Sequence, residues 1–362
     1  MPQVLLLCEF ATLNGGERSM LATLDGIREA GFSIVVAAPP AGPLAETLRQ
    51  QGIEVEPFCA AGMREELAAL IARRRPALVH ANSLSMGRLS GPVVAALGIP
   101  SMAHLRDILK LSRQAVADLN CHGRLAAVSR ATRSFHVAQG LDAEKTRVLY
   151  NGVDLGEFCR RPCTGYLHRE LALPPKARLV GTIGQIGPRK GQDVLARAAA
   201  QIAGERPDVH FLVVGERCSG KAESREFEKA LHDAAATMPG RFHLLGVRPD
   251  VPCLLSELDL LVHPARQEPL GRVLLEAAAA AVPVVATDVG GTREIFPPRP
   301  KSALLVPPGD PEALATAIRD VLGDRGLASR LVLRARRRAE QMFDARKSTR
   351  RLLAEYRSLI RT

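Results

Sequence analysis

The feature that most constrains the fold of this chain is a regular alternation of short apolar runs with longer amphipathic segments. The first half is expected to form strands at 4–8, 33–38, 53–58, 77–81, 101–105 and 125–129, and helices at 18–30, 44–50, 65–74 and 85–97. Unbroken apolar runs such as Val4–Cys8 are typical of strands buried on both faces. Strands that alternate with helices predict an α/β protein, with a parallel sheet covered by helices on both faces.

The alternation stops near Asn151 and resumes near Leu179. Glycine and proline are frequent in between, which indicates a link between two domains. The second half is expected to form strands at 179–183, 210–215, 242–245, 258–263, 284–287 and 303–306, and helices at 192–202, 223–236, 273–281, 313–322, 327–342 and 345–360. A chain of 362 residues is long enough for two cores. We predict a domain at 1–155, a linker at 156–176, a domain at 177–342 and a terminal helix at 343–362.

Two carboxylates flank the start of a predicted helix in the second half. Glu268 follows the strand that ends at His263, Gly271 opens the helix, and Glu276 lies within it among alanines and leucines. A helix N-terminus offers unpaired N–H groups and a positive dipole end, which suit a phosphate. Ligands of open α/β sheets lie beyond the carboxyl ends of the strands. The segment therefore predicts a site for a phosphorylated ligand with hydroxyl groups, and the alternative is a chance pair of glutamates.

Two loops after predicted strands carry groups that suit phosphate. Gly184, Arg189 and Lys190 follow strand 179–183, and Gly15 and Gly16 follow the first strand. Arginine and lysine form charge-assisted hydrogen bonds with phosphate oxygens, and glycine lets the backbone approach a ligand closely. A solvated cation pair and a plain turn are the respective alternatives.

His104 lies at the end of strand 101–105 and is followed by Arg106 and Asp107. A histidine at a strand end is well placed to meet a ligand in an α/β protein. A purely structural histidine is the alternative.

In order and spacing, several motifs resemble those of the retaining glycosyltransferases of family 4. That family has the GT-B fold, with two Rossmann-like domains whose parallel sheets face a central cleft. The resemblance covers nearly the whole chain. The segments that carry it are Asn14–Glu17, Ala127–Ser129, Asn151–Asp154 with Phe158, Gly181–Gly191, Glu268–Glu276 and Gly290–Glu294.

This resemblance implies transfer of a sugar from a nucleoside diphosphate sugar to an acceptor, with the anomeric configuration retained. The residues that would then act in catalysis are His104, Glu268, Arg189 and Lys190. The residues that would bind the donor are Gly15, Gly16, Gly184, Arg248, Leu270, Gly271, Arg272 and Glu276. Glu276 would bind the ribose, Glu268 the sugar hydroxyls, and the loop at Arg248 the nucleobase, mainly through backbone groups.

Two further expectations follow from the resemblance. The terminal helix would pack back on the first domain. Many similar enzymes have an arginine five residues before the lysine of the phosphate loop, whereas this chain has Gln185 there. We expect Arg189 to supply part of the missing positive charge.

Charge is concentrated at the C-terminal end of the sequence. The net charge is +11, and residues 330–362 hold 11 Lys and Arg against 3 Asp and Glu, a net +8. We expect a solvated helix surface there, with weak peripheral membrane association as the alternative. Tryptophan is absent and aromatic residues make up 4% of the chain, which argues against a base-stacking surface for nucleic acid.

Composition also bounds cofactors and location. The seven cysteines lack the spacing of a disulfide framework or a zinc site, so we expect no metal and no cofactor beyond the co-substrate. No secretory signal and no membrane-spanning run is apparent. We expect a cytoplasmic enzyme, with the inner face of the membrane as the alternative. The acceptor is expected to be a carbohydrate, a lipid-linked molecule or a small molecule. Three alternative functions stay open, namely a GT-B epimerase, a sugar phosphorylase and a non-enzymatic binding protein.

Overall fold

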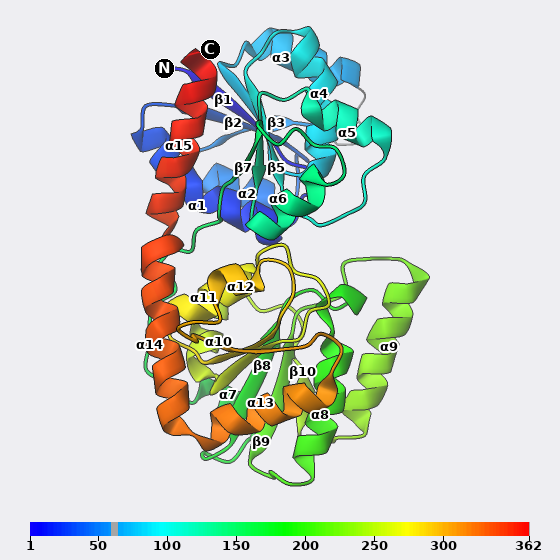
Figure 1. Ribbon diagram of the computed structural model, residues 1–362, viewed down its shortest axis with the longest axis vertical. Helices are drawn as coiled ribbons and strands as arrows, with labels where there is room; N and C mark the ends of the chain where they lie inside the picture. The colour runs from blue at the N-terminus through cyan, green and yellow to red at the C-terminus, as the bar shows by residue number, and fades with distance from the viewer. Residues whose placement is uncertain (59–63, 362) are drawn as a thin grey trace. The chain divides into compact units, whose positions relative to one another are not determined.

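The computed structural model describes residues 1–58 and 64–361 and divides the chain into two compact units (Figure 1). Unit 1 comprises residues 1–154 and 343–362, and unit 2 comprises residues 155–342. Each unit is built on its own parallel sheet.

The sheet of unit 1 has the strand order β3-β2-β1-β4-β5-β6-β7, and all its neighbouring strands are parallel. The strands are β1 (Gln3–Leu7), β2 (Ser33–Ala38), β3 (Glu54–Pro57), β4 (Leu78–Ala81), β5 (Ser101–Leu105), β6 (Arg124–Ala127) and β7 (Thr146–Val148). The helices are α1 (Gly15–Glu29), α2 (Pro43–Gln50), α3 (Arg64–Arg74), α4 (Leu84–Ala96), α5 (Arg113–Asn120), α6 (Arg130–Val137) and α15 (Ala345–Arg361).

Both faces of this sheet are buried. In β1, Val4 and Leu6 belong to a core shared with helices α1, α2 and α15, whereas Leu5 and Leu7 belong to a core shared with α3, α4 and α5. Successive side chains of a strand point to opposite faces, so an apolar run is required when helices cover both sides. The unbroken apolar sequence of β1 is explained by this arrangement.

Helix α15 belongs to unit 1, although it is the last helix of the chain. It lies beside α1 (Figure 1). Leu352, Leu353 and Tyr356 are buried in the core that α15 shares with α1. The Tyr356 ring meets the Phe32 ring edge-on, with 6.0 Å between the ring centroids. This packing brings the C-terminal segment against the strands that carry His80 and His104.

The sheet of unit 2 has the order β10-β9-β8-β11-β12-β13, again with parallel neighbours. The strands are β8 (Arg178–Ile183), β9 (Val209–Val214), β10 (Phe242–Leu244), β11 (Leu260–His263), β12 (Val284–Thr287) and β13 (Leu304–Val306). The helices are α7 (Tyr166–Glu170), α8 (Gln192–Ala203), α9 (Ala222–Ala236), α10 (Val251–Glu257), α11 (Arg272–Ala279), α12 (Thr292–Ile295), α13 (Pro311–Gly323) and α14 (Arg325–Met342), with a short 3₁₀ helix at Pro188–Lys190.

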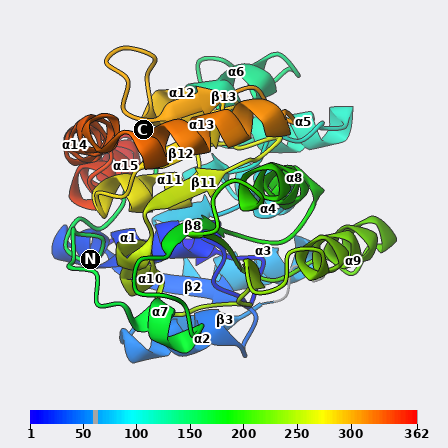
Figure 2. The same ribbon diagram turned by 90° about the horizontal axis from the view of Figure 1, so that it is seen from below.

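One core of unit 2 packs α8, α9, α13 and α14 against one face of the sheet. Helix α8 contacts both α13 and α9, and Figure 2 shows α9 beside α8 at the edge of unit 2. Helix α14 also packs on α11. Arg336 of α14 donates a hydrogen bond to the carbonyl oxygen of Ala279, the last residue of α11, so α14 anchors the C-terminal end of that helix.

Strand order places the loops of interest. The chain reverses the direction in which it adds strands between β1 and β4 in unit 1, and between β8 and β11 in unit 2. Ligands of doubly wound sheets bind at such switch points, beyond the carboxyl ends of the strands. In unit 2, β8 leads to Lys190 and β11 leads to Glu268. In unit 1, β1 leads to Gly15 and β4 leads to Asn82.

The expected strands and helices are present, with small differences in their bounds. The structure adds short elements that the sequence pattern did not predict, namely β7, α5, α7, α10 and α12. The helices among them have eight residues or fewer, which is shorter than the window of about 11–18 residues in which a helical period is recognised. Residues 156–176, expected to form a linker, lie in unit 2 and include α7, which contacts α10.

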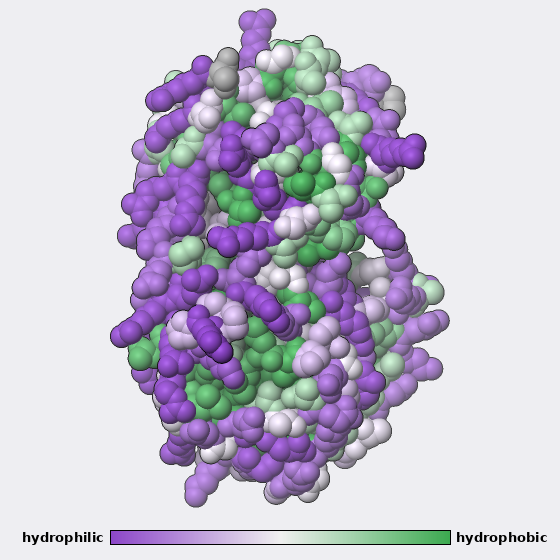
Figure 3. All heavy atoms as spheres, viewed as in Figure 1, coloured by the Kyte–Doolittle hydropathy of each residue, from purple (hydrophilic) through white to green (hydrophobic). Residues whose placement is uncertain are grey.

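On the face shown in Figure 3, hydrophilic side chains predominate over α14 and over α15, at the left edge of the view. Leu331, Leu352 and Leu353 of the +8 segment are buried, and Leu333 is exposed. Most of the apolar surface of these two helices is therefore used in packing. No helix within residues 1–58 and 64–361 has both the length and the apolar character needed to cross a membrane.

We expect the free energy of unfolding to fall as the pH is lowered from about 6.5 toward 4, because unit 1 buries uncharged histidines. Burial lowers the pKa of His122 to about 4 and that of His80 to about 3. In this window the unfolded chain binds more protons than the folded chain. Each such histidine then costs about 1.4 kcal/mol of stability per pH unit, which urea unfolding at several pH values would measure.

A matched pair of variants identifies the source of this slope. His122→Gln should reduce the change in free energy of unfolding per pH unit by the amount that one proton contributes. The same substitution at the exposed His232 should leave it unchanged. Equal slopes for the wild type and His122→Gln would contradict the assignment.

Candidate functional site

Glu268 is the centre of a buried polar cluster in unit 2. The residue is 6% exposed. Its Oε2 lies 2.6 Å from Lys190 Nζ and 2.8 Å from His263 Nε2. The three groups come from the loop after β8, the end of β11 and the loop after β11. The structure thus brings together two predicted site residues, Glu268 and Lys190, with a third residue, His263, that was not predicted as part of the site.

The charges of this cluster follow from its partners. Burial by itself would raise the pKa of Glu268, but the Lys190 charge, the His263 hydrogen bond and the Arg189 charge together hold that pKa well below its usual range. Burial lowers the pKa of His263, and the hydrogen bond that His263 donates to Glu268 only partly opposes this. Glu268 is therefore an anion and His263 a neutral ring whose Nε2–H donates to it.

Two glycines allow the loops around Glu268 to approach one another. Gly191 has φ = +69°, and a Cβ there would lie 2.1 Å from the carbonyl oxygen of Pro264. Gly271 has φ = +99°, and a Cβ there would lie 3.2 Å from Glu268 Cγ. A side chain at either position would clash or strain the backbone. These glycines therefore fix the loop after β8 and the start of α11 around the Glu268 side chain.

Glu276 lies on α11 and is 7% exposed. Its Oε1 accepts a hydrogen bond from Arg272 Nε at 2.7 Å, one turn earlier on the same helix. A buried carboxylate needs such a partner. The predicted donor-binding residues Arg272 and Glu276 are thus paired with each other, at the helix whose N-terminus opens at Gly271. Leu270, 2% exposed, is buried, so its side chain serves packing.

Arg189 and Gly184 border the Glu268 cluster. Arg189 Nη1 lies 3.5 Å from the carbonyl oxygen of Gln267, and its backbone oxygen accepts from Arg266 N at 2.8 Å. A Cβ on Gly184 would lie 3.9 Å from Lys190 Cε, so the lysine side chain passes close to the end of β8. Two cations therefore border a buried anion at the switch point of this sheet.

The Arg248 side chain lies in an ion-pair network. It binds Glu170 at 2.6 Å and Asp250 at 2.9 Å, and Tyr166 donates a hydrogen bond to the same aspartate. The Arg248 hydrogen bonds lower the pKa of Asp250 to about 2. With its side chain engaged in this way, any nucleobase contact in this loop would have to come from the backbone.

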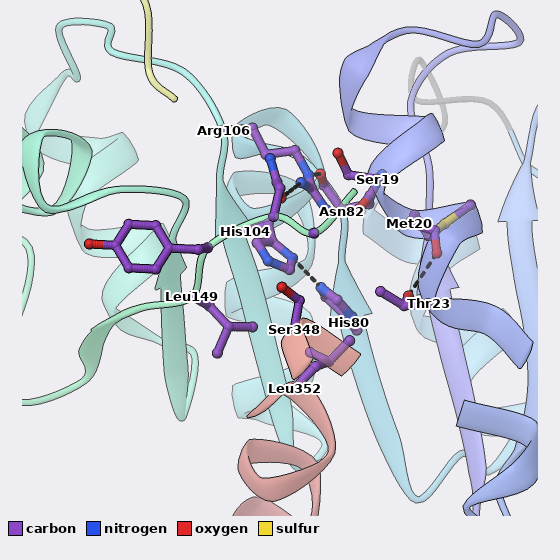
Figure 4. A pocket seen from close by; sticks show the side chains of 13 residues that line it. Ser19, Met20, Thr23, His80, Asn82, His104, Arg106, Leu149, Ser348 and Leu352 are labelled. Carbon is purple, nitrogen blue, oxygen red and sulfur yellow. Dashed lines mark hydrogen bonds between the residues drawn. The ribbon is translucent and has the colours of Figure 1, made fainter. Parts of the chain in front are cut away.

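His104 in unit 1 belongs to a chain of buried hydrogen bonds. His104 Nδ1 lies 2.7 Å from His80 Nε2, and His80 Nδ1 lies 2.6 Å from the Tyr356 hydroxyl. Figure 4 shows the two histidine rings facing each other, with Ser348 and Leu352 of α15 beside them. Burial lowers the pKa of His104 well below its ordinary value, so the ring is neutral.

Arg106 lies beside His104 and is held by neutral oxygens. It donates to Asn82 Oδ1 at 2.7 Å and to Asn151 Oδ1 at 2.9 Å. A Cβ on Gly16 would lie 3.1 Å from Arg106 Cδ, so the predicted glycine loop lies against this arginine. Gly15, the first residue of α1, has open space around its Cα.

These residues border a cavity of about 20 Å³ within unit 1, which is enough for one water molecule. Its lining includes His80, Asn82, His104 and Arg106 (Figure 4). Ser348 Oγ, at the same cavity, is buried and has no hydrogen-bond partner among the described residues. The cavity is therefore polar on several sides.

Sequence patterns did not identify His263, His80 or Tyr356 as part of a site. His263 and His80 each interrupt an apolar strand, and a buried polar group needs a partner. That signal alone could have marked both histidines. Nothing in the sequence indicates that Tyr356, 276 residues after His80, would be the partner of that histidine.

Two family models match the chain. The model described as "Glycosyltransferase Family 4" matches residues 13–157, and the model described as "Glycosyl transferases group 1" matches residues 177–324. Together they span the glycine loop, Lys190 and both glutamates. The chain belongs to the family 4 glycosyltransferases. With two doubly wound parallel-sheet units, it has the GT-B fold of that family.

Curated relatives within the family match part of their own length. The chain is 30% identical to the D-inositol 3-phosphate glycosyltransferase of Jonesia denitrificans, over 60% of this chain and 52% of the relative. It is also 30% identical to the lipopolysaccharide core biosynthesis mannosyltransferase LpsB of Rhizobium meliloti, over 63% of this chain and 65% of the relative. The matched regions thus span about half to two thirds of these family members.

Solved structures match over a greater length. The Anabaena protein Alr3699/HepE in complex with UDP-glucose aligns with a TM-score of 0.88 and 26% identity, covering 99% of this chain and all of the other. The same protein was also solved with UDP and glucose. Similarity therefore extends over both units of this family 4 chain.

Proposed function

We propose that this protein transfers a sugar from a nucleoside diphosphate sugar to an acceptor hydroxyl, with the anomeric configuration retained. The observation that carries the proposal is the ionised, buried Glu268 beside Lys190 and the N-terminus of α11. A carboxylate can bind sugar hydroxyls, while the cations and helix N–H groups suit a diphosphate. A similar protein, HepE, has been crystallised with UDP-glucose, which supports this class of donor.

In the proposed reaction, the bond between the anomeric carbon and the diphosphate oxygen breaks as the acceptor oxygen attacks from the same face. The acceptor proton passes to the departing diphosphate. Lys190, Arg189 and the first N–H groups of α11 stabilise the negative charge that develops on the leaving group. We propose that these groups make a metal ion unnecessary, so that activity persists in EDTA.

A panel of nucleoside diphosphate sugars in a thermal-shift assay tests the proposed function, starting with UDP-glucose. A ligand that binds only the folded protein at 100 times its Kd adds about 2.7 kcal/mol of stability, which raises the melting temperature. Mass analysis of mixtures with candidate acceptors then identifies the products. Free nucleoside diphosphate together with a glycosylated acceptor is the expected result.

Other products would point to the remaining classes. An isomerised donor without acceptor would indicate an epimerase, and cleavage that requires inorganic phosphate would indicate a phosphorylase. A donor that binds and stays intact with every acceptor would indicate a binding protein. Each of these three results would contradict the proposed transfer.

Glu276→Ala is expected to raise the donor KM by about 10-fold with little change in kcat. The proposal places Glu276 on the ribose, away from the bond that breaks, and loss of uniform binding acts mainly on KM. Steady-state kinetics with varied donor measure both constants. Glu340→Ala is a matched control, because Glu340 forms a similar i,i+4 pair with Arg336 on α14. A large loss of kcat at unchanged KM would contradict the ribose assignment.

Arg189→Ala is expected to lower kcat/KM by about 10- to 100-fold, whereas Gln185→Ala should lower it by less than about 3-fold. Arg189 would replace the charge that an arginine at position 185 supplies in similar enzymes, and charge-assisted bonds are roughly twice as strong as neutral ones. Gln185→Arg should be tolerated. Wild-type kcat/KM in Arg189→Ala would show that Lys190 acts without this compensation.

A further inference from the structure

Tyr356, His80 and His104 form a hydrogen-bonded series with a defined direction. The Tyr356 hydroxyl lies 2.6 Å from His80 Nδ1, and His80 Nε2 lies 2.7 Å from His104 Nδ1. The relative exposures of the three residues are 0%, 2% and 4%. Tyr356 is fully buried and is not among the residues that line the cavity, so a protein group has to satisfy its hydroxyl.

The strand register explains how the rings meet. His80 on β4 is paired with Met102 on β5, and His104 is two residues further along β5. Residues two apart on a strand point to the same face, so His80 and His104 are diagonal neighbours within reach of each other. Met102 and Tyr356 belong to one buried core, on the α15 side of the sheet. A residue of the C-terminal helix thus reaches a histidine at a strand end through one intervening ring.

The available partners determine which group donates in each hydrogen bond of the series. Among residues 1–58 and 64–361, the Tyr356 hydroxyl has no hydrogen-bond partner besides His80. If the hydroxyl accepted from His80, its own proton would be left buried without an acceptor, which is costly. Tyr356 therefore donates to His80 Nδ1. A neutral His80 then carries its proton on Nε2 and donates it to His104 Nδ1.

This assignment of donors and acceptors also determines the tautomer of His104. With Nδ1 accepting, a neutral His104 carries its proton on Nε2. Its ring lines the polar cavity beside Arg106 (Figure 4). We propose that Tyr356 and His80 are positioning residues that hold His104 as the Nε2–H tautomer, ready to donate a hydrogen bond to an oxygen of a bound sugar substrate. The substrate part rests on the proposed function, whereas the tautomer does not.

The neutral state of both rings fits this arrangement. Burial and the Arg106 charge lower the pKa of each ring well below neutral pH, with a smaller contribution from His122 for His80 and from His80 for His104. A doubly protonated ring would donate from both nitrogens, and the direction of the series would be lost. In other proteins, too, the partner of one ring nitrogen determines which nitrogen is protonated.

Nitrogen-15 NMR of the histidine-labelled protein tests the tautomer directly, because ring-nitrogen shifts distinguish protonated from unprotonated nitrogens. The wild type should show His104 with protonated Nε2 at neutral pH. Tyr356→Phe removes only the hydroxyl and should yield a mixture of tautomers. It should also lower kcat/KM by about 3- to 10-fold, the value of one hydrogen bond. A wild-type His104 protonated on Nδ1, or unchanged signals in Tyr356→Phe, would overturn the proposal.

Two variants of His80 provide an independent test if Tyr356→Phe fails to fold. His80→Gln keeps one acceptor and one donor, so it can accept from Tyr356 and donate to His104. His80→Phe keeps the ring shape and loses both functions. We expect the His104 Nε2–H signal and the higher kcat/KM in the glutamine variant. Equal signals and equal kcat/KM in the two variants would overturn the positioning role.

Phe32→Leu is the packing control. Phe32 contacts the Tyr356 ring edge-on and is not part of the hydrogen-bonded series. This variant should lower the melting temperature while leaving the His104 signals unchanged. A change in His104 tautomer equal to that in Tyr356→Phe would show that packing, not the hydroxyl, sets the tautomer, and would overturn the proposal. The NMR measurement tests the tautomer even if no sugar donor is turned over, so a failure of the proposed function can be distinguished from a failure of this proposal.

Discussion

Glu268→Gln is expected to lower turnover by about 100- to 1,000-fold, the usual cost of losing one positioned polar group at a reacting centre. The glutamine keeps the shape of the side chain and can still accept a hydrogen bond from His263, but it removes the negative charge. The Lys190 side chain is 18% exposed and can be hydrated, so the fold should persist. Single-turnover kinetics would measure the loss, with circular dichroism to verify folding.

Asp193 offers a matched control for this substitution. It binds Arg266 at 2.6 Å near the surface of the same unit, and both side chains are at least one third exposed. Exposed ion pairs contribute little stability, so Asp193→Asn should retain most of the activity. If a well-folded Glu268→Gln protein turned over within about 3-fold of the Asp193→Asn value, Glu268 would have no part in the reaction.

Lys190→Met should reduce activity by a similar factor and, in addition, destabilise the protein by about 3–5 kcal/mol. The methionine fills much of the same space but leaves Glu268 as a buried charge without its main counter-ion. Burial then dominates and raises the pKa of Glu268 above its unfolded value. The folded variant would bind more protons than the unfolded chain near neutral pH, so its stability should increase as the pH falls toward the unfolded pKa.

The double variant Lys190→Met/Glu268→Gln separates the charge effect from packing. With no buried charge left, it should be more stable than Lys190→Met alone, even though it carries one more substitution. Residues in direct contact are expected to show such non-additive free energies of unfolding. Additive losses from denaturant unfolding of all four proteins would contradict the ion pair as the source of the effect.

Periodicity predicted the layered α/β fold because both sheets are buried on both faces. Apolar runs such as those of β1 and β11 then stand out from the surrounding helices. Some short elements were missed, among them β7 with three residues and α12 with four. The strand order itself is not encoded by periodicity, and it is this order that brings the loops after β8 and β11 together.

Parts of the candidate site could be proposed from the sequence where a local motif marked them. Lys190, Glu268 and Gly271 follow strand ends or open a helix, and each could be named from spacing. His80 and Tyr356 could not, because their contact joins segments at opposite ends of the chain. Periodicity and spacing also gave no sign that the Arg248 side chain pairs with Asp250 and with the distant Glu170, whereas the family resemblance assigned this loop to the nucleobase mainly through backbone groups.

Proton NMR of the anomeric signals during turnover is the most direct test of the proposed function. A nucleoside diphosphate sugar selected by thermal shift would be mixed with acceptor and enzyme, with Glu268→Gln as the parallel reaction. We expect the donor signal to decay and a glycosylated acceptor of the same anomeric configuration to appear, in EDTA as well as in its absence, and only slowly with the variant. A first product of inverted configuration, or equal rates for the two proteins, would contradict retaining transfer at the Glu268 site.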